Sequence, residues 1–336
     1  HDYEKTLIDD ELAQKGLISG KNIEIISKKG DIDNQKGVIL AKNQVKLLSA
    51  GNISNKLGLI SGKLEENPEK SNILDSKNGY FDNKNGNIQS ESSIIIKYNS
   101  GSNDYGTIFS RKNIDLLFNK RDDLDFDEQK NAKLSNYQGN IFSHFDIKAA
   151  HIDNNQGLFQ AENEIDNNFI GIIDNSVGKI LSYGNFSEIS ISAFDDIKNG
   201  GGTVLSNKMI SLDLDSHYQI DGDITTGGYV DISAKSVTNN AKIKAADYIS
   251  FFLKNGDFVN NYDAVLDSDD EIDIAALRGD IINYGDIFGL KIELKTVEDG
   301  DLLNYKNIES VDKLTLDVKN LVDNIESGKK QKGEVS

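Results

Sequence analysis

The sequence predicts an all-β fold, namely a right-handed parallel β-helix of about 14 coils with roughly 21 residues per coil. Three repeated features indicate it: an apolar residue followed two positions later by a small one, a short segment of alternating apolar and polar residues, and an asparagine near the end of most repeats. A constant period of this length is typical of a solenoid, in which each repeat buries its apolar face against its neighbours.

The first strand of each coil is predicted from a β-branched or aromatic anchor and the small residue two positions after it. Successive anchors lie about 21 residues apart, with two longer intervals of 28 and 33 residues. Only Asp267 departs from the small-residue rule. The pairs are Ile18/Gly20, Ile39/Ala41, Ile60/Gly62, Ile88/Ser90, Ile108/Ser110, Ile141/Ser143, Phe159/Ala161, Ile180/Ser182, Val204/Ser206, Ile224/Thr226, Ile243/Ala245, Val265/Asp267, Ile287/Gly289 and Ile308/Ser310.

The second strand is predicted from strict alternation, as in Phe145-Asp-Ile147-Lys-Ala149 and Val230-Asp-Ile232-Ser-Ala234. Alternation of period two sends apolar side chains to one face of a strand and polar ones to the other. Strands this short gain pairing partners when they are wound as parallel coils, each above its equivalent. Parallel crossovers are nearly always right-handed, which gives the predicted hand.

The third strand is predicted from hydrophobic-x-Asn triplets, and eight asparagines, seven of them in such triplets, stand three residues before a glycine. Asparagine and glycine both tolerate the backbone conformations of tight turns. Stacked at one spacing, the amides can bond to one another along the axis, so we expect an asparagine ladder. The triplet asparagines are Asn34, Asn55, Asn83, Asn136, Asn154, Asn175, Asn199, Asn239, Asn261, Asn283 and Asn304, and Asn103 has the same spacing to a glycine.

Composition and charge argue against several classes of function. The chain has 37 basic and 55 acidic side chains, a net charge of −18, and it contains no cysteine. A surface that binds phosphates needs the opposite sign, so nucleic acid is not an expected partner. No apolar stretch approaches the ~20 residues of a membrane span, so no membrane insertion is expected. No cofactor motif is present, and neither a cofactor nor an enzymatic activity is predicted.

The period predicts one continuous solenoid over residues 16–327. Residues 1–15 are expected to form a partial coil or cap, and the basic residues 328–336 a disordered tail. The two long intervals predict inserted loops near residues 63–80 and 119–133. Insertions in a solenoid loop out on the surface and often carry a binding face.

The combined pattern Gly-x-Ile-x-Ser/Ala, Ile-x-Ile-x-Ala, Ile-x-Asn-x-x-Gly resembles the repeats of filamentous-haemagglutinin-like exoproteins of bacterial two-partner secretion. The resemblance covers about residues 16–327. It implies a secreted or cell-surface shaft of an adhesin or of a contact-dependent growth-inhibition toxin. It also implies an outer-membrane transporter as partner, and a receptor or glycan on a host or neighbouring cell. The family's Asn-Pro-Asn-Gly and Val-Glu-Asn-Asn landmarks are absent, so we expect the shaft without its export signal or toxin domain.

Two groups of residues are candidates for binding. The second insertion carries Asp122, Asp123, Asp125, Asp127 and Glu128, whose oxygens suit Ca²⁺ or a receptor, although a solvated acidic loop is the simpler interpretation. The second group, Tyr262, Tyr284 and Tyr305, follows asparagines in consecutive coils. These rings are expected to form a column that either stabilises the solenoid or binds sugars or proteins.

Parallel β-helices also include polysaccharide lyases and hydrolases, and a carbohydrate-active enzyme is therefore the alternative function. Its candidate carboxylates are Asp267, Asp269, Asp270, Glu271 and Asp273. A glycosidase needs two acids at a defined separation beside a sugar-sized groove, and adjacent acids in one turn do not establish one. The histidines lack a matching ligand set, so no metal site is predicted.

Overall fold

The computed structural model describes residues 16–62, 71–77, 79–119, 133–150, 152–169, 173–184, 187–193 and 197–323. The chain is an all-β parallel solenoid of about 13 turns with about 21 residues per turn, which confirms the predicted fold class. No helix occurs within the described ranges. The chain divides into two compact units, residues 1–162 and 163–336.

The described residues of the first unit form 17 strands, which are numbered in chain order. They are β1 (Leu17–Ser27), β2 (Ile32–Asp33), β3 (Val38–Ser49), β4 (Ile53–Ser54), β5 (Leu59–Gly62), β6 (Asn72–Asp75), β7 (Tyr80–Asp82), β8 (Asn87–Ser90), β9 (Ile94–Tyr98), β10 (Ser100–Ser102), β11 (Thr107–Ser110), β12 (Ile114–Phe118), β13 (Leu134–Ser135), β14 (Asn140–Ser143), β15 (Ile147–Ala150), β16 (Ile152–Asp153) and β17 (Leu158–Ala161).

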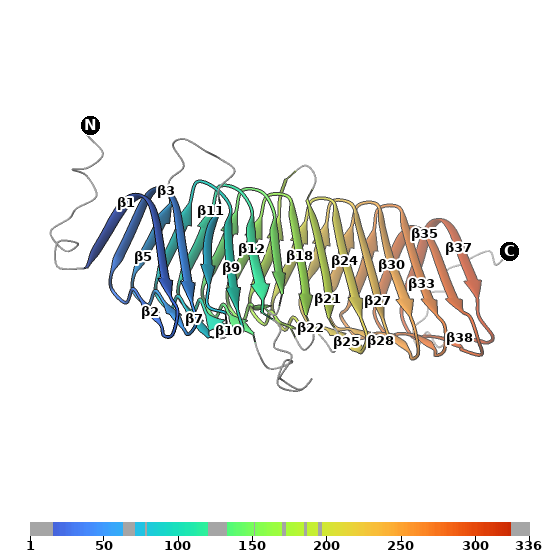
Figure 1. Cartoon of the computed structure of the whole chain (residues 1–336). Coiled ribbons are helices and arrows are strands. Elements are labelled where there is room, and N and C mark those ends of the chain that lie inside the picture. The colour runs from blue at the N-terminus through green and yellow to red at the C-terminus, as the bar shows by residue number, and fades with distance from the viewer. Residues whose placement is uncertain are drawn as a thin grey trace. The chain divides into compact units, whose positions relative to one another are not determined.

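Equivalent strands of the first unit pair in parallel from one coil to the next (Figure 1). First strands pair from β1 through β3, β5, β8, β11 and β14 to β17, and second strands from β3 through β6, β9 and β12 to β15. The third strands β2, β4, β7, β10, β13 and β16 form their own ladder. Each coil therefore contributes a segment to each of three ladders, and in β1 and β3 the first two segments form one continuous strand.

The second unit repeats this arrangement. Its strands are β18 (Glu164–Phe169), β19 (Ile173–Asp174), β20 (Lys179–Ser182), β21 (Glu188–Ala193), β22 (Ile197–Lys198), β23 (Thr203–Ser206), β24 (Met209–Leu214), β25 (His217–Ile220), β26 (Ile224–Thr226), β27 (Tyr229–Ala234), β28 (Ser236–Asn239), β29 (Lys242–Ala245), β30 (Tyr248–Leu253), β31 (Phe258–Asn260), β32 (Val265–Ser268), β33 (Glu271–Ala276), β34 (Ile281–Asn283), β35 (Asp286–Thr296), β36 (Leu302–Asn304), β37 (Ile308–Asp317) and β38 (Leu321–Asp323). The third strands β25, β28, β31, β34, β36 and β38 pair in parallel and are called the third sheet below.

The core follows the predicted pattern. Anchors such as Ile108 and Ile141 are fully buried, and the small partners Ser110 and Ser143 are buried beside them. The alternating second strands bury every other side chain, as Val230, Ile232 and Ala234 do. Stacked apolar columns of this kind supply most of the free energy that holds neighbouring coils together.

The asparagine ladder is present in both units. In the first unit the side-chain amide of each member donates to the next, as from Asn83 to Asn103 and from Asn103 to Asn136, both at 2.7 Å. In the second unit Asn239 donates to Asn260 and Asn260 to Asn283, both at 2.9 Å. The members are buried, so a missing partner would leave an amide unsatisfied where water does not reach it.

The ladder is interrupted once within the second unit. Ile220 lies in register with Asn239 and takes the ladder position of its coil. Asn199, the member before it, accepts a bond from Asn175 at 2.7 Å, but its own side-chain nitrogen is buried without a hydrogen-bond partner. Ile220 itself is fully buried. Apolar burial thus replaces one pair of ladder bonds at this coil.

The glycines after the ladder have a steric role rather than the predicted conformational one. In the turn after Asn136 the left-handed residue is Gln138, with φ of 50°, and the N–H of Gly139 donates to the carbonyl of Asn136 at 3.1 Å. A Cβ on Gly139 would lie 2.2 Å from the backbone oxygen of Asn103 in the preceding coil. Glycine is needed because the backbone of the adjacent coil passes directly over it.

Three details of the predicted register are wrong. Leu266 and Ser268, not Val265 and Asp267, are the inward pair of their coil, because Leu266 pairs with Ile243 and Ile287. Asp267 therefore points outward. Asn260, not Asn261, is the ladder member, since it lies between Asn239 and Asn283. In each case two adjacent residues satisfy the local pattern, and only the pairing of whole strands decides between them.

The third wrong detail concerns Phe145, which is 49% exposed and precedes β15 instead of starting its inward face. The predicted insertion at residues 63–80 is also narrower than expected, because β6 and the start of β7 lie within it. Residues 63–70 of that insertion, residues 120–132 of the second one, and both ends, 1–15 and 324–336, lie outside the described residues.

Replacing a ladder asparagine by leucine should lower the free energy of unfolding more where the asparagine makes both ladder bonds than where it makes only one. Asn260→Leu removes two ladder bonds and leaves two buried amides short of a partner, which should lower the free energy of unfolding by about 2–4 kcal/mol. Asn199→Leu, in the same unit, removes one ladder bond and its own unsatisfied nitrogen, and should cost about half as much. Urea unfolding followed by circular dichroism measures both. Equal decreases in the free energy of unfolding for the two variants would contradict the claim that the ladder bonds stabilise the fold.

Candidate binding face

The outward side of the third sheet carries three parallel columns of side chains in the second unit. They run along the stacked strands β31, β34, β36 and β38, where residues in register occupy equivalent positions. One column is acidic, one aliphatic and one aromatic. Together they are called the third-sheet face.

The aliphatic column consists of Val259, Ile282, Leu303 and Val322. The first three are half-buried and Val322 is 40% exposed. Each is the middle residue of its hydrophobic-x-Asn triplet or the equivalent position of β38. In the preceding coil the same column holds Thr238. Aliphatic side chains here point away from the core and form a continuous apolar stripe.

The aromatic column is the predicted tyrosine group, and its stacking is confirmed. The ring centroids of Tyr262 and Tyr284 are 5.1 Å apart and those of Tyr284 and Tyr305 are 4.7 Å apart, with the rings nearly parallel. Tyr284 thus has a neighbour on each ring face. Tyr262, which is 72% exposed, stands at the start of this column and has a stacked neighbour on one ring face.

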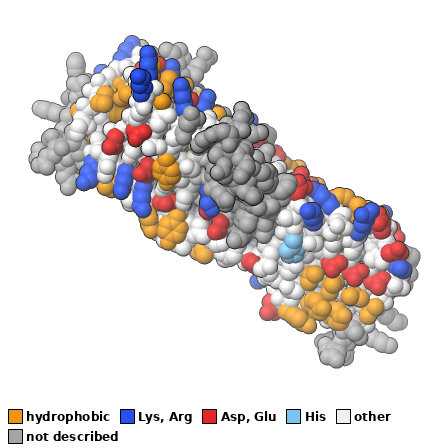
Figure 2. Space-filling view, turned by 60° about the horizontal axis from the view of Figure 1, so that its bottom comes forward, with side chains coloured by type: hydrophobic (Ala, Val, Ile, Leu, Met, Phe, Trp, Pro, Cys, Tyr) orange, Lys and Arg blue, Asp and Glu red, His pale blue; other side chains and the backbone are white. Residues whose placement is uncertain are grey.

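The acidic column comprises Asp257, Asp280 and Asp301, with Asn320 after them. A carboxylate oxygen of Asp257 accepts the backbone N–H of Asp280, and one of Asp280 accepts that of Asp301, both at 2.8 Å. Asp301 accepts the side-chain amide of Asn320 at the same distance. Figure 2 shows apolar side chains gathered beside a row of acidic ones at the lower right of this view.

This geometry limits how the tyrosines can bind a sugar. Sugar recognition by an aromatic residue normally uses an open ring face, against which the apolar side of the sugar packs. In this column the faces of Tyr284 are occupied by its neighbours, so it presents its edge and hydroxyl group. The column therefore stabilises the stack directly, and its binding role remains a prediction.

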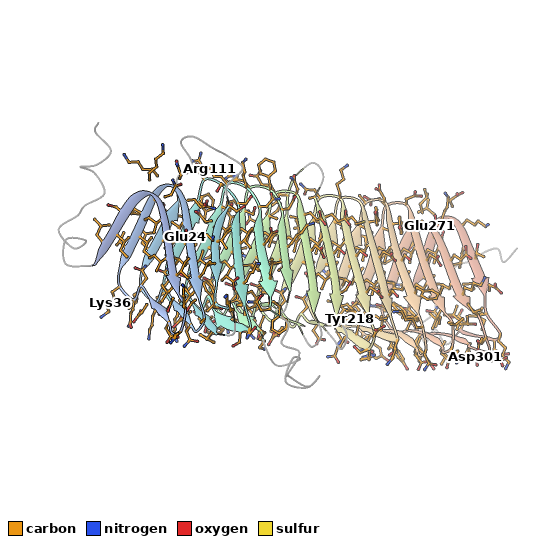
Figure 3. All side chains as sticks on the ribbon, viewed as in Figure 1. Glu24, Lys36, Arg111, Tyr218, Glu271 and Asp301 are labelled. Atoms are coloured by element: carbon orange, nitrogen blue, oxygen red, sulfur yellow. The ribbon has the colours of Figure 1, made fainter. Side chains whose placement is uncertain are left out.

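The other predicted groups lie elsewhere. Asp122, Asp123, Asp125, Asp127 and Glu128 lie outside the described residues, so the prediction of a binding loop stays open. The acidic group at residues 267–273 lies at the first and second strands. Figure 3 places Glu271 at the upper edge of the second unit and Asp301 at its lower edge, so the two acidic sets are separate.

A shallow groove lies beside part of that acidic group. It is lined by Asp267, Phe288 and Glu309, which lie in register on successive strands. The other lining residues are Ser268, Asp269, Gly289, Leu290 and Val311. Asp267 makes an ion pair with Lys244 at 3.3 Å. Asp267 and Glu309 are two coils apart, roughly 9–10 Å between their strands.

Asp273 lies on the outward face of the second strands, where its carboxyl is partly buried and close to other acidic side chains. Its burial, followed by the charges of Glu293 and Glu271, raises the pKa of this carboxyl, and Lys295 offsets only part of the effect. Glu293 is its direct neighbour in the next coil. Like charges in register repel, so ionised Asp273 destabilises the stack.

Sequence reasoning found the tyrosines but missed the aliphatic and acidic columns. The signal was present in the middle residue of each triplet, which is Asp33, Ser54, Asp82, Ser102, Ser135, Asp153, Asp174, Lys198 and Thr238 in earlier coils and then changes to Val259, Ile282 and Leu303. A change from polar to apolar at an outward position marks a surface that the fold itself does not require.

Comparisons with known proteins give no further assignment. No family model matches the chain, and no curated protein or solved structure does. Among the described residues, no group of three or more His, Asp or Glu side chains is placed to hold a metal ion. The described part of the chain likewise has no helix long and apolar enough to cross a membrane.

Asp273→Asn should raise the melting temperature near pH 7 by a few degrees at most. Because the pKa of Asp273 is raised in the folded state, folding favours its proton, and the ionised group destabilises the fold at pH values above that pKa. The advantage of the asparagine should shrink as the pH falls through the raised pKa of the folded-state carboxyl, and it should vanish below the ordinary pKa of the unfolded chain, where the wild-type carboxyl is neutral in both states. Asp269→Asn removes the same charge from an exposed position and serves as control. A pH-independent gap between Asp273→Asn and wild type would contradict this account.

Proposed function

We propose that the chain is a shaft segment of a secreted bacterial surface exoprotein, which supports adhesion or holds a distal toxin or receptor-binding module. The observation that carries the proposal is the repeated, in-register stacking of equivalent coils within each unit. A coil whose strands bond only to the coils before and after it can be repeated to any length without a new core. That property suits a spacer.

The contacts that the polar side chains make between neighbouring coils support the same role. The asparagines, the aspartates of the third sheet and the tyrosines bond or stack with their own equivalents in the next coil. These contacts strengthen the stack. The similarity of the repeats to filamentous-haemagglutinin-like exoproteins, described above, leads us to propose an outer-membrane transporter as export partner and the cell surface as location.

Export provides the test. The chain is fused behind a two-partner secretion signal domain, with an epitope at its C-terminus, and expressed in a Gram-negative host with the matching transporter. The shaft role predicts that the epitope reaches the cell surface and that surface protease leaves the solenoid largely intact. The same fusion without the transporter is the control and should stay inside. Retention of the epitope in the presence of the transporter would contradict the proposal.

A second candidate is a carbohydrate-active β-helix, and the groove beside Asp267 and Glu309 favours it. The strands that carry them lie roughly 9–10 Å apart, a spacing similar in scale to the roughly 6.5–9.5 Å between the carboxyl groups of inverting glycosidases, and Phe288 lies between them in register. Release of reducing ends from a polysaccharide panel, lost in both Asp267→Asn and Glu309→Gln, would support an enzyme. The shaft role predicts no such release.

A further inference from the structure

We propose that the third-sheet face docks a basic amphipathic α-helix of a partner protein, laid along the stacking direction of the second unit. The apolar side of the helix would cover Val259, Ile282, Leu303 and Val322. Its lysine or arginine side chains would face Asp257, Asp280 and Asp301. This interaction goes beyond the shaft role and does not depend on it.

The apolar stripe is not a requirement of the fold. Earlier coils build the same third strand with aspartate, serine or threonine at this outward position, as at Asp33 and Thr238. Four consecutive aliphatic residues therefore replace polar ones where the solenoid tolerates either. A contiguous apolar stripe that is partly open to solvent and has a polar border is consistent with a protein interaction site.

The carboxylates that border the apolar stripe indicate that the partner is positively charged. Asp257, Asp280 and Asp301 use one oxygen each for neighbouring amides, and none forms an ion pair with a cationic side chain among the described residues. Other acids of this unit do so, as Asp286 does with Lys306 at 2.8 Å and Glu298 with Arg278 at 2.8 Å. A row of carboxylates without cations beside an apolar stripe complements a surface that is basic and apolar.

The spacing selects a helix over an extended peptide. Stacked coils repeat about every 4.8 Å, and one helical turn rises about 5.4 Å, so over the three steps from Val259 to Val322 the two drift by only ~2 Å. Side chains on one face of an extended strand repeat about every 6.7 Å, which gives a drift of ~6 Å. Apolar residues at helix positions i, i+4, i+7 and i+11 thus meet successive coils.

Two other occupants fit less well. The face spans four coils and about five residues across, an area on the order of 200 Å², whereas a stable dimer buries about 800 Å² per partner. A second copy of this chain would need contacts beyond this face. A glycan would meet mostly aliphatic side chains and stacked tyrosine rings, and of the open aromatic surface that sugars use it would find chiefly the ring of Tyr262.

The test uses the whole chain and a synthetic, helix-stabilised, fluorescently labelled peptide of about 14 residues, with four leucines on one stripe and lysines on one flank. Fluorescence anisotropy should show saturable binding that strengthens at low salt. Ile282→Thr with Leu303→Thr should weaken binding at least about tenfold. Asp280→Asn with Asp301→Asn, which preserves shape, should weaken it about threefold to tenfold.

Matched controls separate the two contributions. A peptide with glutamates in place of the lysines should bind at least about tenfold more weakly, and a peptide with scrambled leucines should not saturate. Threonine occupies the same column at position 238, so the double threonine variant should keep its circular dichroism spectrum and melting temperature.

Several results would overturn the proposal. They are the absence of saturable binding of the lysine peptide, equal binding of the glutamate peptide, or unchanged binding by the folded double threonine variant. Self-association in sedimentation that the double threonine variant abolishes would assign the face to a second copy instead. Glycan-array binding lost in that variant would assign it to a carbohydrate.

Discussion

The structure depends on one constraint: a buried side-chain amide must find partners in the coils before and after it, at the spacing of the stack. An asparagine at the ladder position donates to the next member and accepts from the previous one, as Asn103 and Asn260 do. Each bond contributes about 1 kcal/mol, but an unsatisfied buried amide costs more. The ladder therefore specifies the register of the coils as much as it stabilises them.

The same constraint explains features around the ladder. The backbone of each coil passes so closely over the turn of the next that only glycine fits at positions such as Gly139. Parallel in-register stacking also multiplies whichever side chain occupies an outward position. Repeated tyrosines become a stacked column, repeated aspartates a row bonded through backbone N–H groups, and repeated aliphatic residues an apolar stripe. Like charges such as Asp273 and Glu293 meet for the same reason.

The sequence predicted the fold because each coil repeats one pattern, so that an error in one coil is outweighed by agreement in the rest. It could not decide between adjacent residues that satisfy the pattern equally, which is why Asp267 and Asn261 were placed one position from the true inward residues Ser268 and Asn260. The tyrosine column was predictable because three rings follow asparagines at one spacing. The aliphatic column was not recognised, since the residues at outward strand positions were assumed to be polar and to have no role beyond contact with solvent.

The central claim is that one coil is an interchangeable unit held by register. Deleting residues 246–268 tests it most directly, because Ala246, Asp247 and Tyr248 are equivalent to Asp269, Asp270 and Glu271 and the join preserves register. For this full-coil deletion the account predicts a folded protein that unfolds cooperatively and whose circular dichroism signal per residue is unchanged. Deletion of residues 246–256, about half a coil, should instead abolish cooperative unfolding of the second unit. Loss of folding in the full-coil deletion, or folding retained in the half-coil deletion, would contradict it.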